Sequence, residues 1–128
     1  MGMGGTVVRV LVVDDQRPFR TAAAAVLKRM ADFELVGESE TGEDAVVAAR
    51  ALQPDLVLMD VKLPGISGIE AAGLVTAATP ESLVVLCSTY ARDDLPFRID
   101  EPGVSGYLHK EELRAPALRD LWHRLGGC

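Results

Sequence analysis

Cysteine is scarce in this sequence: Cys87 and Cys128 are the two among 128 residues. Two thiols, one within an apolar run and one at the last position, do not form the disulfide framework that stabilises small secreted proteins. Their scarcity excludes that class and indicates a reducing compartment, the cytoplasm. We expect Cys87 to be buried for packing and Cys128 to lie in a loose tail.

Long apolar runs are absent as well. No stretch approaches the ~20 apolar residues that a membrane-spanning helix needs. Residues 1–6 lack both the charged segment and the long apolar segment of a secretory signal. We therefore expect no membrane partner, and we interpret residues 1–6 as a flexible tail that is either native or added in cloning.

Positive charge is in deficit. Lysine and arginine together number 13 against 19 aspartates and glutamates, which gives a formal net charge of −6 at pH 7. Such a chain is not drawn electrostatically to nucleic acid or to an anionic membrane. No helix-turn-helix pattern follows residue 125, so we expect no direct nucleic-acid binding by this chain. The acidic balance is compatible with a cation site or a basic partner.

What the sequence does contain is short apolar runs that alternate with helical patterns, in a chain of one-domain length. Runs rich in valine and leucine predict buried strands, and apolar residues three and four apart predict helices. The expected strands span 7–13, 33–37, 55–60, 83–88 and 103–109, and the expected helices 18–30, 41–52, 67–79 and 113–125. This alternation predicts an α/β fold with a five-stranded parallel sheet, doubly wound by helices on both faces. Residues 7–125 then form one domain, followed by a short tail at 126–128.

Local signals place several helix ends. Pro18 is tolerated in a first helical turn, and Thr41 and Ser67 each precede an acidic residue by three positions, as in a capping box. The connection between the fourth and fifth strands is the exception, because Pro96 and Pro102 stand six residues apart. We predict a short or irregular fourth helix there.

Polar residues stand where the expected strands stop. They are Asp14 and Asp15 after the first strand, Asp60 at the end of the third, Ser88 at the end of the fourth and Lys110 after the fifth. Parallel strands bring their carboxyl ends to one edge of a sheet, where open α/β proteins bind ligands. An acidic residue that ends a buried run also costs free energy unless it is paired or metal-bound. We therefore expect these side chains to form one site.

Three carboxylates that lie close together need a counter-charge at neutral pH. A hard divalent cation supplies it, and carboxylate, carbonyl and water ligands suit Mg²⁺. A phosphoryl group beside such a cation would be contacted by Lys110 and by the Ser88 hydroxyl, so that charge developing during its transfer is neutralised. Asp60 is then the candidate nucleophile, forming an aspartyl-phosphate.

With this arrangement the chain resembles the receiver domains of two-component response regulators. The matching segments are, in chain order, Val12-Val13-Asp14-Asp15, Leu58-Met59-Asp60 with Pro64-Gly65 and Gly68, Leu86-Cys87-Ser88, and Gly106-Tyr107-Leu108-His109-Lys110. The resemblance extends from Val7 to Leu125 and is nearest to receivers that precede a NarL- or LuxR-type helix-turn-helix. It implies a flavodoxin-like sheet with the strand order 2-1-3-4-5.

The resemblance also implies a role for each matching residue. Asp60 is the residue that accepts a phosphoryl group from a sensor histidine kinase or a phosphotransfer protein, and Lys110 pairs with that group. Asp14, Asp15 and Asp60, with the backbone carbonyl of Lys62, hold Mg²⁺. The domain catalyses its own phosphorylation and a slow dephosphorylation, and we expect no turnover of a separate substrate.

Further implied roles concern the output of the switch. Ser88 is the hydroxyl that moves toward the phosphoryl group, and Tyr107 is the aromatic residue whose ring moves between buried and exposed positions. Lys62 and Tyr90 occupy the variable positions that tune the dephosphorylation rate. The face formed by the fifth strand and the last helix changes its affinity for partners, and a second copy of this chain is a candidate partner there.

Each residue also has a simpler interpretation. Asp14 and Asp15 could cap the following helix, Lys110 could pair with a neighbouring glutamate, and Tyr107 could be an ordinary half-buried aromatic. Four segments in the right order, each at a strand end, favour the site. Between the adjacent hydroxyls of residues 88 and 89 we favour Ser88, because it ends the apolar run.

The chain departs from the family pattern in three places. Ser88 stands where threonine is more usual, and Glu111 follows Lys110 where many receivers have proline. Pro96 and Pro102 fall on a helix that usually belongs to the signalling and dimerisation face. The first two changes leave the acidic pocket intact, and the third bears on the partner surface.

Two other functions compete with this interpretation. A receiver-like interaction module that works without phosphorylation would lack a residue of the acidic pocket, and none is missing. A flavodoxin-like cofactor binder would need a phosphate-cradling loop after the first strand, where Asp14 and Asp15 would repel a phosphate without a metal.

Overall fold

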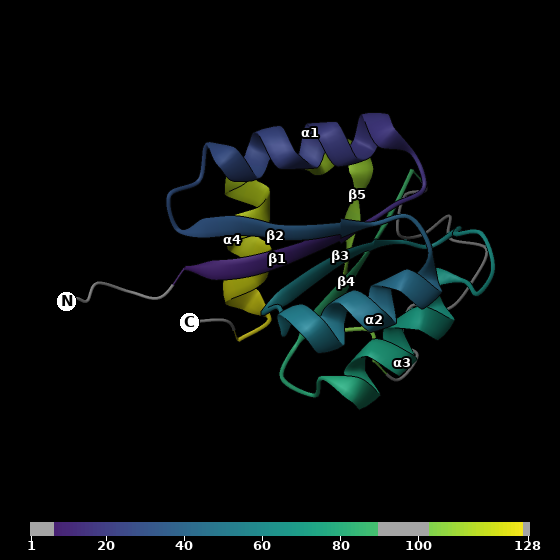
Figure 1. Ribbon diagram of the computed structural model, residues 1–128. Helices are drawn as coiled ribbons and strands as arrows, with labels where there is room; N and C mark the ends of the chain where they lie inside the picture. Colours follow the sequence, from purple (N-terminus) through teal and green to yellow (C-terminus); the bar gives the residue numbers. More distant parts are fainter. Residues whose placement is uncertain (1–6, 90–102, 127–128) are drawn as a thin grey trace.

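The chain forms a five-stranded parallel sheet with helices on both of its faces (Figure 1). The structure is a computed structural model that describes residues 7–89 and 103–126. The strand order β2-β1-β3-β4-β5 confirms the predicted order, and each neighbouring pair is parallel. The strands are β1 (Val8–Val13), β2 (Phe33–Ser39), β3 (Leu56–Asp60), β4 (Leu83–Ser88) and β5 (Gly106–His109).

The helices alternate with the strands along the chain, as the sequence predicts. Within the described residues they are α1 (Arg17–Lys28), α2 (Gly42–Leu52), α3 (Gly68–Ala78), a 3₁₀ turn (Lys110–Glu112) and α4 (Ala115–Arg124). Helices α1 and α4 cover one face of the sheet, and α2 and α3 cover the other (Figure 1). The doubly wound architecture is therefore confirmed.

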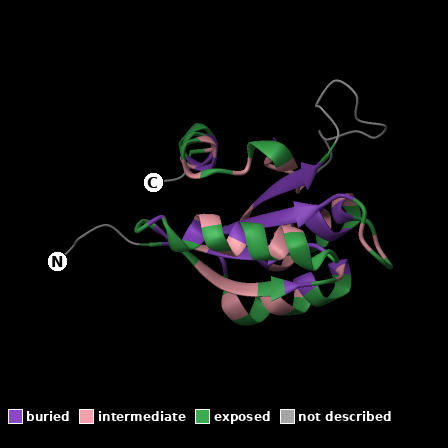
Figure 2. Cartoon of the chain, turned by 90° about the horizontal axis from the view of Figure 1, so that it is seen from above, coloured by how far each residue is buried: buried purple, intermediate pink, exposed green. Residues whose placement is uncertain are grey.

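The central strands are buried on both sides, as Figure 2 shows. Side chains of β1 alternate between two apolar clusters: Val10 and Val12 pack toward α1 and α4, whereas Leu11 and Val13 pack toward α2 and α3. Two covered faces explain why these strands read as continuous apolar runs. Cys87 is buried in the α1/α4 cluster, as expected.

Two of the predicted helix starts have the predicted cap. The Thr41 hydroxyl accepts a hydrogen bond from the Asp44 amide at 3.0 Å, and the Ser67 hydroxyl accepts one from the Glu70 amide at 3.2 Å. Each cap satisfies an amide that the first helical turn leaves without a backbone partner. Pro18 lies in the first turn of α1, where its missing N–H costs nothing.

The element ends differ from the prediction at several points. Strand β2 continues two residues beyond residue 37, to Ser39. Strand β5 begins at Gly106 instead of residue 103, and α4 begins at Ala115 after the 3₁₀ turn, because Pro116 sets its first turn.

Some expectations fall outside the described residues. These are the short fourth helix at 93–102 and the tails at 1–6 and 127–128. Among residues 7–89 and 103–126, no helix is long and apolar enough to cross a membrane.

Gly68, the first residue of α3, lies directly against the end of β3. Its amide donates a hydrogen bond to the carbonyl of Val61 at 2.8 Å. A Cβ atom at this position would stand 2.0 Å from the backbone oxygen of Asp60 and 2.9 Å from the Cα of Val61. Since backbone atoms cannot move aside as a flexible side chain can, the close approach of α3 to Asp60 requires glycine.

We predict that Gly68→Ala lowers the free energy of unfolding by about 1–3 kcal/mol, the usual cost of overpacking. Urea denaturation followed by circular dichroism measures this. Gly106→Ala is the matched control, because the nearest atom to a Cβ there is 3.4 Å away, an ordinary contact. Equal stability changes in the two variants would contradict the predicted clash.

Candidate functional site

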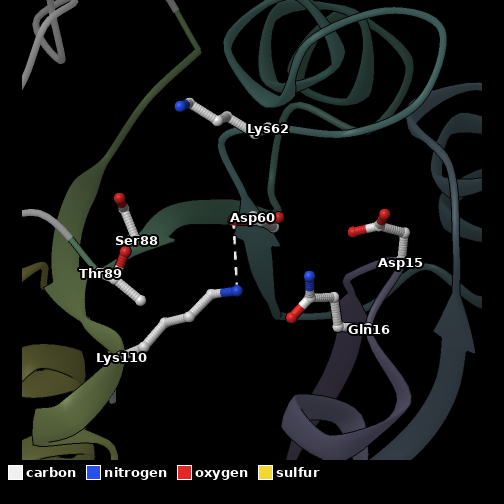
Figure 3. A pocket seen from close by; sticks show the side chains of 7 residues that line it. All are labelled: Asp15, Gln16, Asp60, Lys62, Ser88, Thr89 and Lys110. Atoms are coloured by element: carbon white, nitrogen blue, oxygen red, sulfur yellow. Dashed lines mark ion pairs between the residues drawn. The ribbon is translucent and has the colours of Figure 1, made fainter.

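The carboxyl ends of the strands surround one pocket, with a volume of about 490 Å³. Its lining residues come from the ends of β1, β3, β4 and β5 and are Asp15, Gln16, Asp60, Lys62, Ser88, Thr89 and Lys110. In Figure 3 the side chains of Lys62 and Lys110 lie on opposite sides of Asp60, and Asp15 and Gln16 lie across the pocket from Ser88 and Thr89. The structure thus brings together the strand-end residues that the sequence analysis singled out.

Three carboxylates form the acidic part of this site. One oxygen from each of Asp14, Asp15 and Asp60 lies within 4.8 Å of the others. Asp14 is fully buried and Asp60 is 8 % exposed, whereas Asp15 is exposed. Two buried like charges at this distance repel each other strongly, so the site needs positive charge to keep them ionised.

Lys110, which directly follows the edge strand β5, supplies part of that charge. Its Nζ donates a hydrogen bond to Asp14 Oδ2 at 2.6 Å and lies 3.4 Å from Asp60 Oδ1. Burial alone would lower the lysine pKa, but the hydrogen bond to Asp14 and the charges of Asp60 and Asp14 outweigh it and raise the pKa. The ammonium is therefore held charged between two carboxylates.

The Asp60 carboxyl is not fully compensated by this one ammonium. Burial, and next the charge of Asp14, raise the pKa of Asp60 from 3.8 to about 6, against the opposing effect of Lys110. An ionised Asp60 at neutral pH therefore costs free energy in the metal-free protein. A divalent cation beside it would lower that cost.

The donor set fits Mg²⁺. This cation takes hard oxygen ligands and keeps several waters, so it needs few protein carboxylates and an open face. Asp15 and Asp60 line the open pocket, while Asp14 has one oxygen on Lys110 and the other, Oδ1, accepting from the Gln16 amide at 2.8 Å. Lys62 lines the same pocket, and the role of its backbone carbonyl as a ligand stays a prediction.

Ser88 lies where the sequence placed the switch hydroxyl. It is the last residue of β4, pairs in register with His109 of β5, and is 6 % exposed. Thr89, the next residue, also lines the pocket but is exposed. The position of Ser88 at the strand end agrees with the sequence-based preference, and its function stays a prediction.

Tyr107 is linked to the pocket without being among its lining residues. Its hydroxyl donates to the backbone oxygen of Ser88 at 3.4 Å, and its half-buried ring packs against the α2/α3 cluster. Burial raises the pKa of this hydroxyl. Tyr107 therefore touches the strand end that carries Ser88, as a residue coupled to that hydroxyl must. Tyr90, the other predicted tuning residue besides Lys62, lies outside the described residues.

Sequence reasoning missed three residues near the site, all on or just before α1. Gln16 lines the pocket, the Phe19 ring centroid lies 4.6 Å from Lys110 Nζ, and Arg20 Nη1 donates to the backbone oxygen of Asp14 at 2.8 Å. The face of an aromatic ring attracts an ammonium, so Phe19 helps to hold Lys110. Gln16 follows the acidic pair directly, which is a usable signal. The sequence identifies Phe19 only as an apolar residue of a helix, because its contact with Lys110 depends on how α1 packs in the folded protein.

Comparisons with known proteins agree with this geometry. Residues 10–121 match the family described as the response regulator receiver domain. The chain is 40 % identical over 103 residues to the response regulator GacA of Pseudomonas aeruginosa. The aligned segment covers 80 % of this chain and 48 % of that relative. The chain thus spans about half the length of the curated relatives it matches.

Solved structures share the fold over nearly the whole chain. The signal receiver domain of the response regulator NarL from Mycobacterium tuberculosis is 28 % identical, with a TM-score of 0.84, and the match covers 97 % of this chain and all of the other. A chain from the crystal structure of the P1 domain of CheA3 in complex with CheY6 from R. sphaeroides is 25 % identical, with a TM-score of 0.80 and coverage of 95 % and 98 %.

The raised pKa of Asp60 predicts a pH-dependent stability in the absence of divalent cations. The Asp60 carboxyl has a pKa of 3.8 in the unfolded chain and about 6 in the folded protein. The free energy of unfolding therefore falls as pH rises from one pKa to the other. Asp60→Asn, which cannot ionise, should therefore be more stable than the parent by about 1–3 kcal/mol at about pH 8. The gain should shrink as pH is lowered toward 3.8.

Urea denaturation in EDTA across this pH range measures the effect. Asp120→Asn, at an exposed carboxylate on α4, is the control and should show no comparable gain. An Asp60→Asn variant no more stable than the parent at about pH 8 would contradict the unfavourable ionisation of Asp60.

Proposed function

This chain belongs to the family of response regulator receiver domains, and from that membership we propose that Asp60 is its phosphoacceptor. The observation that carries the proposal is the cluster of Asp14, Asp15 and Asp60, in which Lys110 contacts both Asp14 and Asp60. Asp60 is the one of these carboxylates that ends a strand inside the pocket. It is therefore the carboxylate that an entering phosphoryl group meets.

The proposed reaction is an attack by an Asp60 oxygen on the phosphorus of a phosphohistidine. The new bond joins that oxygen to phosphorus, the nitrogen–phosphorus bond breaks, and the released imidazole takes a proton. Lys110, 3.4 Å from Asp60 Oδ1, neutralises charge on the phosphoryl oxygens, and the Ser88 hydroxyl offers a hydrogen bond to another. The same groups would assist hydrolysis of the acyl phosphate by water, which makes the domain a catalyst of its own slow dephosphorylation.

Asp14, Asp15 and Asp60, with the backbone carbonyl of Lys62, would hold Mg²⁺ in this site. When bound, Mg²⁺ contributes positive charge that brings the carboxylate and the phosphoryl oxygens together. Lys62 and Tyr90 would tune the lifetime of the phosphorylated state from positions beside the pocket.

The proposed output is a change in the face formed by β5 and α4. The phosphoryl group draws Ser88 inward, and Tyr107, hydrogen-bonded to the backbone of Ser88, follows. Such a local charge change biases an element between two states. A second copy of this chain, docked through that face, is a candidate partner.

The proposed phosphoryl donor is a sensor histidine kinase or a phosphotransfer protein. The similar chain in complex with a P1 domain of CheA3 supports a partner of that class. The proposed domain is 7–125, acting in the cytoplasm. We propose that this acidic chain does not itself bind nucleic acid. The curated relatives are about twice as long, so the proposal concerns only the residues of this chain.

Incubation with Mg²⁺ and acetyl phosphate tests the acceptor. The intact mass should increase by one phosphoryl group in the parent protein and in Asp120→Asn, and should stay unchanged in Asp60→Asn and in the presence of EDTA. Asp60→Asn keeps the shape of the side chain but replaces its nucleophilic oxygen.

Two outcomes would contradict the proposal. A parent protein that stays unmodified at saturating donor would favour an interaction module that works without phosphorylation. A mass increase retained in Asp60→Asn would place the modification on another residue.

A further inference from the structure

Arg20, the fourth residue of α1, reaches back to the acidic pair. Its Nη1 donates a hydrogen bond to the backbone oxygen of Asp14 at 2.8 Å. Its Nε lies 3.2 Å from Glu38 Oε1, and its Nη1 lies 4.0 Å from Glu40 Oε1. The side chain is 14 % exposed, so this planar fork is held in place between the loop after β1 and the end of β2.

The contact fixes the peptide that carries Asp15. The carbonyl of Asp14 and the amide of Asp15 belong to one planar unit. The Asp14 amide donates to the Ser39 carbonyl at 3.0 Å on one side, and Arg20 holds the Asp14 carbonyl on the other. Asp15 is exposed, so the direction of its carboxylate depends on the backbone that carries it.

The charge of Arg20 is unfavourable for this site if Coulomb forces alone are considered. A guanidinium within hydrogen-bonding distance of the acidic loop repels a divalent cation. Glu38 and Glu40 offset part of that repulsion. Arg20 can therefore favour cation binding only by fixing the backbone of the Asp14–Asp15 loop.

We propose that Arg20 is a positioning residue for the Mg²⁺ site, acting by holding the Asp14–Asp15 peptide in the orientation that aims Asp15 into the pocket. The inference rests on the proposed function, because it concerns the cation site described there. Replacing a group that orients a metal ligand typically weakens metal binding by roughly 10- to 100-fold. Arg20 does this through the backbone of the ligand.

The competing explanation is that Arg20 only fastens α1 to β2. The two explanations predict opposite signs when the charge is removed. A mere fastener, once replaced by a neutral residue, leaves Mg²⁺ binding unchanged or tighter, because one repelling charge has gone. A positioning residue leaves Mg²⁺ binding weaker despite that favourable change in charge.

Isothermal titration calorimetry with MgCl₂ on the full chain distinguishes these outcomes. Arg20→Met should weaken Mg²⁺ binding by about 10-fold, the lower end of the range for outer-shell partners. Arg119→Met is the matched control: it removes the same charge and an ion pair with Asp32 at 2.8 Å, at the opposite end of the sheet from the pocket. The control should bind Mg²⁺ as the parent does.

Arg20→Lys separates geometry from charge and covers the case in which Arg20→Met does not fold. Lysine keeps the positive charge but lacks the planar fork that spans the Asp14 carbonyl and the Glu38 carboxylate together. It should also weaken Mg²⁺ binding, with little change in the unfolding transition measured in EDTA by circular dichroism.

The outcomes separate this inference from the proposed function. A parent protein that takes up no Mg²⁺ would overturn both. A parent that binds Mg²⁺, with folded Arg20 variants that bind it equally or more tightly, would overturn the positioning role alone.

Discussion

The contact between Lys110 and the carboxylates of Asp14 and Asp60 is the interaction on which the site depends. Two buried carboxylates at the edge of an apolar sheet are unfavourable by themselves, and a single ammonium between them makes the arrangement tolerable. It does not make it neutral, since the pKa of Asp60 still rises to about 6. A cation bound beside Asp60 would relieve this residual unfavourable charge.

The sheet creates this situation through its topology. The order β2-β1-β3-β4-β5 places β1 beside β3, so that Asp14, just after β1, lies near Asp60 at the end of β3. Strands β4 and β5 come next and bring the Ser88 hydroxyl and the Lys110 ammonium to the same edge. Every strand runs in the same direction, so all of these ends share one edge. Helices on both faces bury the central strands, and the carboxylates, the hydroxyl and the ammonium of the site lie at the carboxyl edge.

The sequence was sufficient to place the residues whose position in the site follows from where a strand ends. Asp14, Asp60 and Ser88 end or follow apolar runs, and parallel strands allow one arrangement of their ends. It was insufficient for Phe19 and Arg20, which look like ordinary members of an amphipathic helix and gain their contacts from the packing of α1. The start of β5 was also misplaced. Val104 suits a strand locally, but Gly103 adopts a positive φ of 95° against α3 and the ladder begins at Gly106.

The lysine–aspartate contact that completes the site joins residues 96 positions apart in the chain. During synthesis the acidic strands emerge first, and the ammonium arrives only when the last strand of the sheet is in place. A chain interrupted before β5 has the carboxylates of Asp14 and Asp60 without the Lys110 ammonium, in a sheet that lacks its edge strand. Assembly of the carboxylate cluster with its counter-charge is thereby tied to completion of the domain.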